Sequence, residues 1–265
     1  YSIDASGYIT HLDTLDVPGG DDGFGVWGDG NFLYLAASTG GLHTFSVDGS
    51  GNLTHIDSHD PGDISYNVWG DGNFIYLAAG TTGLHTYSVD GSGNLTHIDS
   101  HVYGVGHYCR DVHGDGNFIY VAVQYAGLLV YSVDGSGNLT FIDIDTTTSY
   151  SVNVWTDGGI IYSGASSDGI RTYSVNEEGS LTPIDFDDQG DNAWGVWGDG
   201  TFIYLANYGE GLHTYSVGTT ALINVNSLVN LGFENITTPL DTAPFNEGDT
   251  IQFTVQSRDE LEEGT

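Results

Sequence analysis

Lysine and methionine are absent from this 265-residue chain, and cysteine occurs once, at Cys109. One cysteine cannot form a disulfide within the chain. The chain has three arginines, Arg110, Arg171 and Arg258, against 36 acidic residues, and its net charge is −33. Nucleic-acid binding needs cations that neutralise phosphates, so this composition excludes it. Because methionine is missing, we expect Tyr1 to be a processed end or an internal cut.

Long apolar runs are also missing. No segment approaches the roughly 20 apolar residues that span a bilayer, so we expect no membrane insertion. Proline occurs only 5 times, whereas glycine occurs 40 times, which is typical of many tight turns between short strands. The acidic surface would attract cations, and stability or assembly should therefore depend on salt or calcium.

A repeat of 42 to 44 residues dominates the sequence. A WGDGNF-like segment recurs, with its aspartate at Asp29, Asp71, Asp115, Asp157 and Asp199. In the first unit, one strand ends near Trp27 and others are expected at Phe32–Ala36, Leu42–Val47 and Leu53–Ile56. Gly-Asp-Gly and Asp-Gly-Ser-Gly-Asn turns separate the strands. Four antiparallel strands per unit predict an all-β propeller over residues 1–217.

The repeat alone leaves the number of blades open. Five blades are favoured, with Ile9–Asp13 closing the ring as the fourth strand of the last blade. Alternatively, Leu222–Val225 is that fourth strand and residues 1–13 are half of an extra blade. Six or seven blades would follow if sequence upstream is missing.

The repeat stops after about Gly218, and residues 218–265 are expected to be a short β extension or the start of a further domain. Thr250–Gln256 alternates apolar and polar residues, as a strand with one buried face does. A two-stranded unit is marginal alone. We therefore expect the tail to cover a sheet edge, on its own propeller or on the next subunit.

Three segments resemble known families. VWGDGNFIYLAAGTTGLHTYSVD (Val68–Asp90) resembles the LVIVD-repeat propellers, and IYLANYGEGLHTYSV (Ile203–Val217) resembles the lactonase-type (YVTN) propellers. FNEGDTIQFTV (Phe245–Val255) resembles the opening strands of bacterial immunoglobulin-like or Calx-β surface modules. The lactonase resemblance implies a sugar-lactone hydrolase, although propellers carry many unrelated activities.

Differences between the units point to one face of the propeller. The first-to-second and third-to-fourth turns are nearly identical, whereas the loops on the opposite face differ from unit to unit. Variable loops on a rigid scaffold are where binding usually occurs, although neutral variation is the alternative. The candidate ligand-binding residues on this variable face are Tyr66, Tyr108, Arg110, Tyr125, Tyr150, Trp194 and Tyr208.

Two acidic loops are candidate cation sites, and calcium would suit their oxygen ligands. One holds Asp185, Asp187, Asp188 and Asp191, and the other holds Asp57, Asp60 and Asp63. The Asp48-Gly-Ser-Gly-Asn turn also opens like a calcium loop. Its position 12 is His59 rather than glutamate, so a hairpin with an Asx turn is favoured. The recurrent tryptophans are expected to pack between blades.

Catalytic motifs are sparse: neither GxSxG nor HExxH occurs. Cys109 lies near His107 and Arg110, but neighbours in an extended chain point apart. We therefore predict no enzyme, but an extracellular structural or binding module of a larger assembly, such as a virion tail fibre or cell-surface filament. Its expected partners are proteins, copies of itself, or glycans. A lactonase-like hydrolase and a secreted carbohydrate-binding propeller are the alternatives.

Overall fold

The computed structural model describes residues 1–3, 5–17, 22–147, 150–166, 168–188 and 193–216. The chain divides into two compact units, Tyr1–Val217 and Gly218–Thr265. The second unit lies outside the described residues, as do the strands expected at Leu222–Val225 and Thr250–Gln256.

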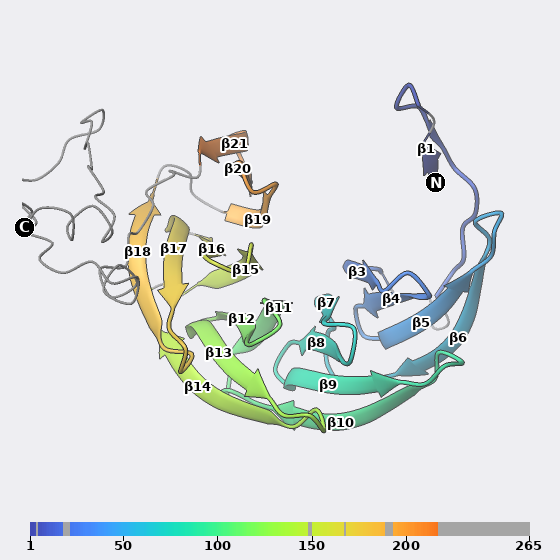
Figure 1. The fold of residues 1–265 in the computed structure, drawn as a ribbon, viewed down its shortest axis with the longest axis horizontal. Helices are drawn as coiled ribbons and strands as arrows, with labels where there is room; N and C mark the ends of the chain where they lie inside the picture. Colours follow the sequence, from blue (N-terminus) through green and yellow to red (C-terminus); the bar gives the residue numbers. More distant parts are fainter. Residues whose placement is uncertain (4, 18–21, 148–149, 167, 189–192, 217–265) are drawn as a thin grey trace, which may run out of the picture. The chain divides into compact units, whose positions relative to one another are not determined.

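Antiparallel sheets follow one another in chain order through the described part of the first unit (Figure 1). Blade 1 comprises β3 (Gly25–Gly28), β4 (Phe32–Ala37), β5 (Gly41–Val47) and β6 (Leu53–His59). Blade 2 comprises β7 (Asn67–Gly70), β8 (Ile75–Ala79), β9 (Gly83–Val89) and β10 (Leu95–His101). Blade 3 comprises β11 (Tyr108–Gly114), β12 (Ile119–Gln124), β13 (Gly127–Val133) and β14 (Leu139–Asp145). Blade 4 comprises β15 (Ser151–Thr156), β16 (Ile161–Ala165), β17 (Gly169–Val175) and β18 (Leu181–Asp187).

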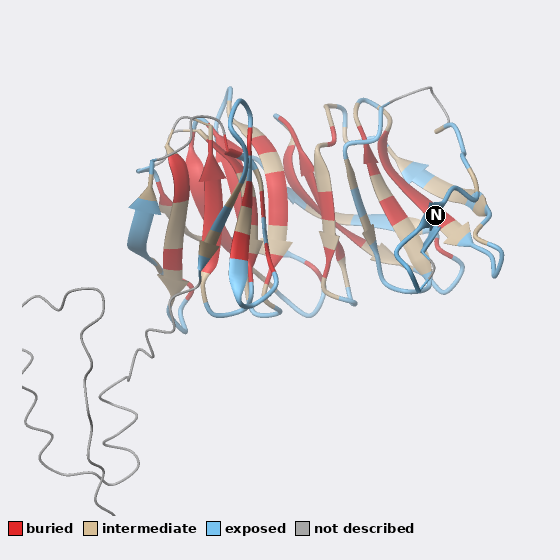
Figure 2. Ribbon diagram, turned by 90° about the horizontal axis from the view of Figure 1, so that it is seen from above, coloured by how far each residue is buried: buried red, intermediate tan, exposed pale blue. Residues whose placement is uncertain are grey.

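Blade 5 has three described strands: β19 (Ala193–Gly198), β20 (Phe202–Asn207) and β21 (Gly211–Ser216). The first strand of each blade lies on the inner side, and the fourth lies on the outer rim (Figure 1). Buried residues are concentrated along the strands, while the turns at both ends are exposed (Figure 2). The all-β propeller predicted from the repeat is confirmed. In the described part of the chain, no helix is long and apolar enough to cross a membrane.

The N-terminal residues do not close the ring as expected. β1 (Ser2–Ile3) and β2 (Ile9–Thr10) pair with each other in a sheet of their own. Asp13 Oδ2 accepts a hydrogen bond from the Leu53 amide at 2.8 Å. The same bond joins the outer strands of successive blades at Asp57–Leu95, Asp99–Leu139 and Asp143–Leu181. β2 therefore holds the position of an outer strand beside blade 1, but among the described residues it pairs with β1 and not with β21. The other part of the alternative arrangement, a fourth strand at Leu222–Val225, lies outside the described residues.

Tryptophan rings join successive blades on the inner side. A Cβ atom added to Gly70, Gly114 or Gly198 would lie within 2.6 Å of the tryptophan ring of the blade before it. The three rings are those of Trp27, Trp69 and Trp155. Because only glycine leaves room for the ring, the recurrent tryptophans pack between blades, as predicted.

A chain of polar side chains crosses blades 2 to 4 on their inner strands. Asp111 is 3% exposed, and its Oδ1 accepts hydrogen bonds from the Asn67 side-chain amide and the Val112 backbone. Its Oδ2 accepts bonds from Asn153 Nδ2 at 2.6 Å and the Val154 amide at 2.9 Å. Burial raises the pKa of Asp111 to about 6, against the opposing effect of these hydrogen bonds. One carboxylate thus connects three blades.

Histidines join blades 1 and 2 on the outer strands. His85 is 6% exposed, and its Nδ1 lies 3.1 Å from His97 Nε2. His59 of blade 1 stacks on His97, with ring centroids 5.3 Å apart. Burial, followed by the nearby His97 and His59, lowers the pKa of His85 to about 4. The fold therefore requires His85 to be neutral.

The buried His85 makes stability depend on pH. In the unfolded chain His85 binds a proton as pH falls below about 6.5, whereas in the folded protein it does so only near pH 4. The contribution of His85 to the free energy of unfolding is therefore complete above pH 6.5 and declines as pH falls below it. Between pH 7.5 and 5, which is still above the isoelectric point, this should remove about 2 kcal/mol. His85→Leu should abolish that part of the loss, and Leu129 already occupies the equivalent position in blade 3. Urea unfolding of both proteins at the two pH values measures the difference. Equal pH dependence would contradict this assignment.

Candidate functional site

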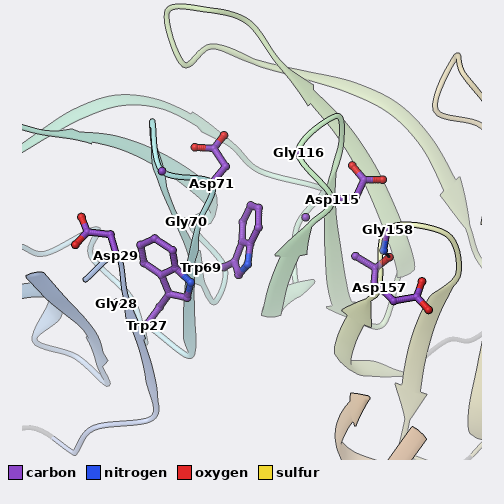
Figure 3. A pocket seen from close by; sticks show the side chains of 13 residues that line it. Trp27, Gly28, Asp29, Trp69, Gly70, Asp71, Asp115, Gly116, Asp157 and Gly158 are labelled. Carbon is purple, nitrogen blue, oxygen red and sulfur yellow. Dashed lines mark hydrogen bonds between the residues drawn. The ribbon is translucent and has the colours of Figure 1, made fainter. Parts of the chain in front are cut away.

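A hollow of about 650 Å³ opens on the face of the repeated turns between blades 1 and 4 (Figure 3). Its walls are the tryptophans Trp27 and Trp69 and the turns that follow the first strands of blades 1 to 4, which are Gly-Asp-Gly in blades 1 to 3 and Thr-Asp-Gly in blade 4. Four carboxylates, from Asp29, Asp71, Asp115 and Asp157, lie around it (Figure 3).

The side chains around this hollow already serve the fold. Asp29 Oδ1 accepts hydrogen bonds from the amides of Asn31 and Phe32, each at 2.7 Å, and its Oδ2 accepts one from Tyr34 Oη at 2.9 Å. The same three bonds recur at Asp71, Asp115 and Asp199. Asp157 accepts hydrogen bonds from the amides of Gly159 and Ile160, each at 2.9 Å. The carboxylates around the hollow are thus hydrogen-bonded within their own turns.

The variable face is built where the second-to-third loop of one blade meets the entry to the next. The Ser65 amide donates to the Ser38 carbonyl at 2.7 Å, and the Cys109 amide donates to the Gly80 carbonyl at 2.9 Å. The backbones of Gln124 and Tyr150 form an antiparallel β-bridge between blades 3 and 4 in the same way. These backbone contacts hold loops of neighbouring blades side by side on a rigid sheet scaffold.

Five of the predicted ligand-binding residues come together there, joined by one residue that the sequence analysis missed. We call this set the aromatic row; its members are Phe24, Tyr66, Arg110, Tyr108, Tyr125 and Tyr150. It extends from the entry to blade 1 to the entry to blade 4.

Ring contacts connect the aromatic row from end to end. Phe24 stacks on Tyr66 with centroids 5.9 Å apart, and Arg110 Cζ lies 4.2 Å from the Tyr66 ring centroid and 5.8 Å from that of Tyr108. Tyr108 meets Tyr125 edge-on at 6.3 Å, and Tyr125 meets Tyr150 at 5.1 Å and 90°. The six side chains of the row are therefore in continuous contact with one another.

Arg110 is fixed at the centre of the aromatic row. Its Nε donates to Gln124 Oε1 at 2.6 Å, and Gln124 is only 3% exposed. A guanidinium held over two tyrosine faces gains cation–π attraction while keeping other N–H groups for a ligand. A hydrogen bond with Tyr125 raises the pKa of Tyr150, and the Arg110 charge opposes that shift. Tyr150 therefore stays neutral and able to donate a hydrogen bond.

Tyr125 has an unusual backbone conformation. Its φ is +71°, in the left-handed region where residues other than glycine are strained, and its side chain is 52% exposed. Such strain persists only where the surroundings impose it, and it is concentrated at functional sites. The backbone of this loop is thus strained at the residue whose aromatic ring is exposed to solvent.

The other two predicted ligand-binding residues lie elsewhere. Trp194 and Tyr208 belong to blade 5 and are 58% and 77% exposed. Among the described residues, no ring contact joins them to the aromatic row. Phe24 and Gln124 were missed because neither differs from its surroundings in the sequence, and only the arrangement of blades brings them to the row.

Among the described residues, the predicted cation ligands form no metal-binding group. Asp57 Oδ2 bonds the Leu95 amide, Asp60 Oδ1 bonds the Gly62 amide, and Asp63 Oδ2 bonds the Thr81 amide and hydroxyl. Asp191 lies outside the described residues. In the described part of the chain, no group of three or more acidic, histidine or cysteine side chains is placed to hold a metal. Asp185, Asp187 and Asp188 are among the residues to which this applies.

The Asp48-Gly-Ser-Gly-Asn turn is the hairpin that the sequence favoured. Asp48 Oδ1 accepts the amides of Ser50 and Asn52, and Oδ2 accepts Asn52 Nδ2 at 2.7 Å. The same pattern recurs at Asp90 and Asp134. The carboxylates in these turns thus bind their own backbone.

Cys109 is packed into the core between blades 2 and 3. It is 3% exposed, and burial raises the pKa of its thiol to about 12. A buried thiol with a raised pKa is a poor nucleophile. The adjacent His107 instead makes an edge contact with Tyr103.

Comparisons with known proteins bear on the fold. No protein-family model and no curated protein matches the chain. A Bacteroides fragilis protein proposed to be a 6-phosphogluconolactonase superposes with a TM-score of 0.64 at 16% identity, over 79% of this chain and 70% of that one. The computationally designed Ika8 protein superposes with a TM-score of 0.57 at 10% identity, over 74% and 58%.

The extracellular domain of BT4673 from Bacteroides thetaiotaomicron, a proposed one-component system, superposes with a TM-score of 0.56 at 20% identity. The match covers 77% of this chain and 28% of that one. The matches therefore span just over half of the designed protein and just over a quarter of the BT4673 extracellular domain. At these identities the likeness shows the propeller fold alone. Extracellular domains are among the proteins that share it.

Proposed function

We propose that this chain is a non-enzymatic extracellular binding module of a larger assembly and that the aromatic row contacts its ligand. The observation that carries the proposal is the continuity of Tyr66, Arg110, Tyr108, Tyr125 and Tyr150 across loops of successive blades. The repeat does not require these residues, since other units carry different ones at the same places. The extracellular domains among the structural neighbours support the location.

Neutral carbohydrate is the ligand class that suits the aromatic row. Sugar rings present flat C–H faces that pack on exposed tyrosine, and their hydroxyls bond to Tyr Oη and guanidinium N–H groups. The net charge of −33 repels anionic ligands such as phosphorylated sugars. A neutral oligosaccharide avoids that repulsion.

The test is binding of the full chain to a panel of immobilised neutral and acidic oligosaccharides, followed by titration calorimetry with the best neutral binder. Tyr66→Ala should weaken binding by at least tenfold, because it removes a stacking surface and the support of Arg110. Tyr208→Ala is the matched control, since this exposed tyrosine lies outside the aromatic row, and it should bind like the wild type.

Two outcomes would contradict the proposal: no neutral saccharide binds, or Tyr66→Ala binds as tightly as Tyr208→Ala. A lactonase-like hydrolase is the competing function. We expect no lactone hydrolysis above background, because the cysteine that the sequence offers as a nucleophile is buried with a raised pKa. Hydrolysis abolished by one substitution on the variable face would establish the enzyme instead.

A further inference from the structure

Arg110 is the bulged residue in the first strand of blade 3, and its hydrogen-bond partner Gln124 ends the second strand. The pairing of β11 with β12 shifts register between Cys109 and Asp111, which leaves Arg110 between them. Bulges of this kind redirect a side chain and often occur beside functional sites. Arg110 Nε donates to Gln124 Oε1 at 2.6 Å, and Gln124 is only 3% exposed. A buried amide therefore fixes the direction of the guanidinium.

The repeat does not require this pair of residues. The positions equivalent to Arg110 in the other units hold Phe24, Tyr66, Val152 and Trp194, and those equivalent to Gln124 hold Ser38, Gly80, Ser166 and Tyr208. Neither residue stands out alone, because both positions vary from unit to unit. The contact relates them, since an arginine and its acceptor occur together in one blade. A pair that blade packing does not require indicates a role on the variable face.

Gln124 also holds the next tyrosine of the aromatic row. The pKa of Tyr150 is raised, chiefly by a hydrogen bond with Tyr125, and a hydrogen bond with the Gln124 side chain opposes that shift. A bond that favours the ionised phenol is one that the phenol oxygen accepts, so the Gln124 amide is the donor. One buried side chain thus positions Arg110 of blade 3 and Tyr150 of blade 4.

The N–H groups at the end of Arg110 are left for a ligand. In the part of the chain that the structure describes, no carboxylate lies within ion-pair distance of Arg110, although the chain has 36 acidic residues. Gln124 uses the Nε, and among the described residues no hydrogen bond involves the Nη atoms. The guanidinium therefore keeps the edge formed by its two Nη groups, which presents two parallel donors in a fixed plane.

Two parallel donors need two acceptor oxygens that lie side by side. A carboxylate offers such a pair, but the net charge of −33 repels anions. In a neutral sugar, hydroxyls on adjacent carbons provide it. We propose that Arg110, positioned by Gln124, binds two adjacent hydroxyls and thereby determines which neutral glycans the aromatic row accepts. This inference rests on the function proposed above, because it concerns the same site.

Glycans that differ only in linkage test the inference. In a 1,4-linked chain of glucose, galactose or xylose, each internal sugar keeps free hydroxyls on carbons 2 and 3. In the 1,3-linked isomer, no internal sugar keeps two adjacent hydroxyls. Titration calorimetry of the full chain with β-linked hexasaccharides of both kinds gives the ratio of affinities. The wild type should bind at least one 1,4-linked hexasaccharide about tenfold more tightly than its 1,3-linked isomer, because the isomer leaves the paired donors without acceptors.

Substitutions at the pair should remove this preference without removing all binding. Arg110→Lys keeps the positive charge but not two fixed parallel donors, so the ratio should fall close to one. Arg171→Lys is the matched control, since it makes the same change at the arginine that lies over Phe186 in blade 4, and it should keep the wild-type ratio. Gln124→Leu should lose the preference, and Gln124→Glu, which restores an acceptor for Nε, should regain it. Circular dichroism checks that each variant is folded.

The outcomes separate this inference from the function on which it rests. If no neutral glycan binds, the proposed function is wrong and the inference is wrong with it. If neutral glycans bind and Tyr66→Ala weakens them, but the wild type does not distinguish the isomers or Arg110→Lys keeps the ratio, only the inference is overturned. Tighter binding of a glucuronate-containing chain would also overturn it, because Arg110 would then serve a carboxylate. The same ratio in both Gln124 variants would contradict the positioning role of Gln124.

Discussion

Asp111→Ala should lower the free energy of unfolding by about 3–5 kcal/mol, because the substitution leaves four donors around a buried position without this acceptor. These donors are the side-chain amides of Asn67 and Asn153 and the backbone amides of Val112 and Val154. Losing the carboxylate also removes the cost of burying its charge, but an unpaired buried donor costs more than a hydrogen bond gains.

Asp48→Ala is the matched control for Asp111→Ala. The Asp48 carboxylate also accepts three hydrogen bonds, but it lies in an exposed hairpin where water replaces the lost acceptor. Urea unfolding followed by circular dichroism should show a much smaller loss for Asp48→Ala. Similar losses for both variants would mean that Asp111 does not connect the blades as the structure indicates.

Trp69→Ala should lower the free energy of unfolding by about 3 kcal/mol, because it leaves a void between blades 2 and 3 over Gly114. Trp197→Ala changes the same position of the repeat in blade 5, where the ring is 57% exposed. Urea unfolding of the two variants gives the comparison, and the loss should be smaller for the exposed ring. A loss as large for Trp197→Ala would contradict the role given to Trp69 in packing between blades.

The repeat predicted most of the fold because each turn is held by its own residues. Asp29 and Asp48 bond amides within four positions, so the sequence of one unit suffices to place its strands. The joining of blades was harder to read. His113 replaces the tryptophan of blade 3, and Thr156 replaces the glycine of blade 4 that would lie beneath that ring. The two changes are visible in the sequence, but they can be recognised as a pair only when the blades are stacked.

Closure of the ring could not be decided from strand counting. The third-strand segment occurs at both ends of the repeat, as Tyr1-Ser2-Ile3 and Tyr215-Ser216-Val217, so Ile9–Asp13 fits either end equally well. The hydrogen bond from Leu53 to Asp13 is expected in either arrangement, and what separates them is that β2 pairs with β1 rather than with β21. That bond links residues 40 positions apart and depends on the packing of successive blades.

The candidate site was partly predictable for a related reason. Tyr66, Tyr108 and Tyr125 stood out because the units differ in these loops. The acidic loops stood out equally, but Asp57 and Asp63 are bonded to amides that the sequence does not place near them. Residue type alone could not separate tyrosines that face solvent from carboxylates that the fold already uses.

Ligand binding should occur on the aromatic row and not in the hollow on the opposite face. Hydrogen–deuterium exchange of the full chain, with and without the neutral oligosaccharide that binds it best, compares the two directly. Protection should appear at residues 64–66, 107–111, 124–126 and 150–152, with no change in the turns at residues 28–31, 70–73 and 114–117. Protection of those turns, with the aromatic row unchanged, would contradict the account.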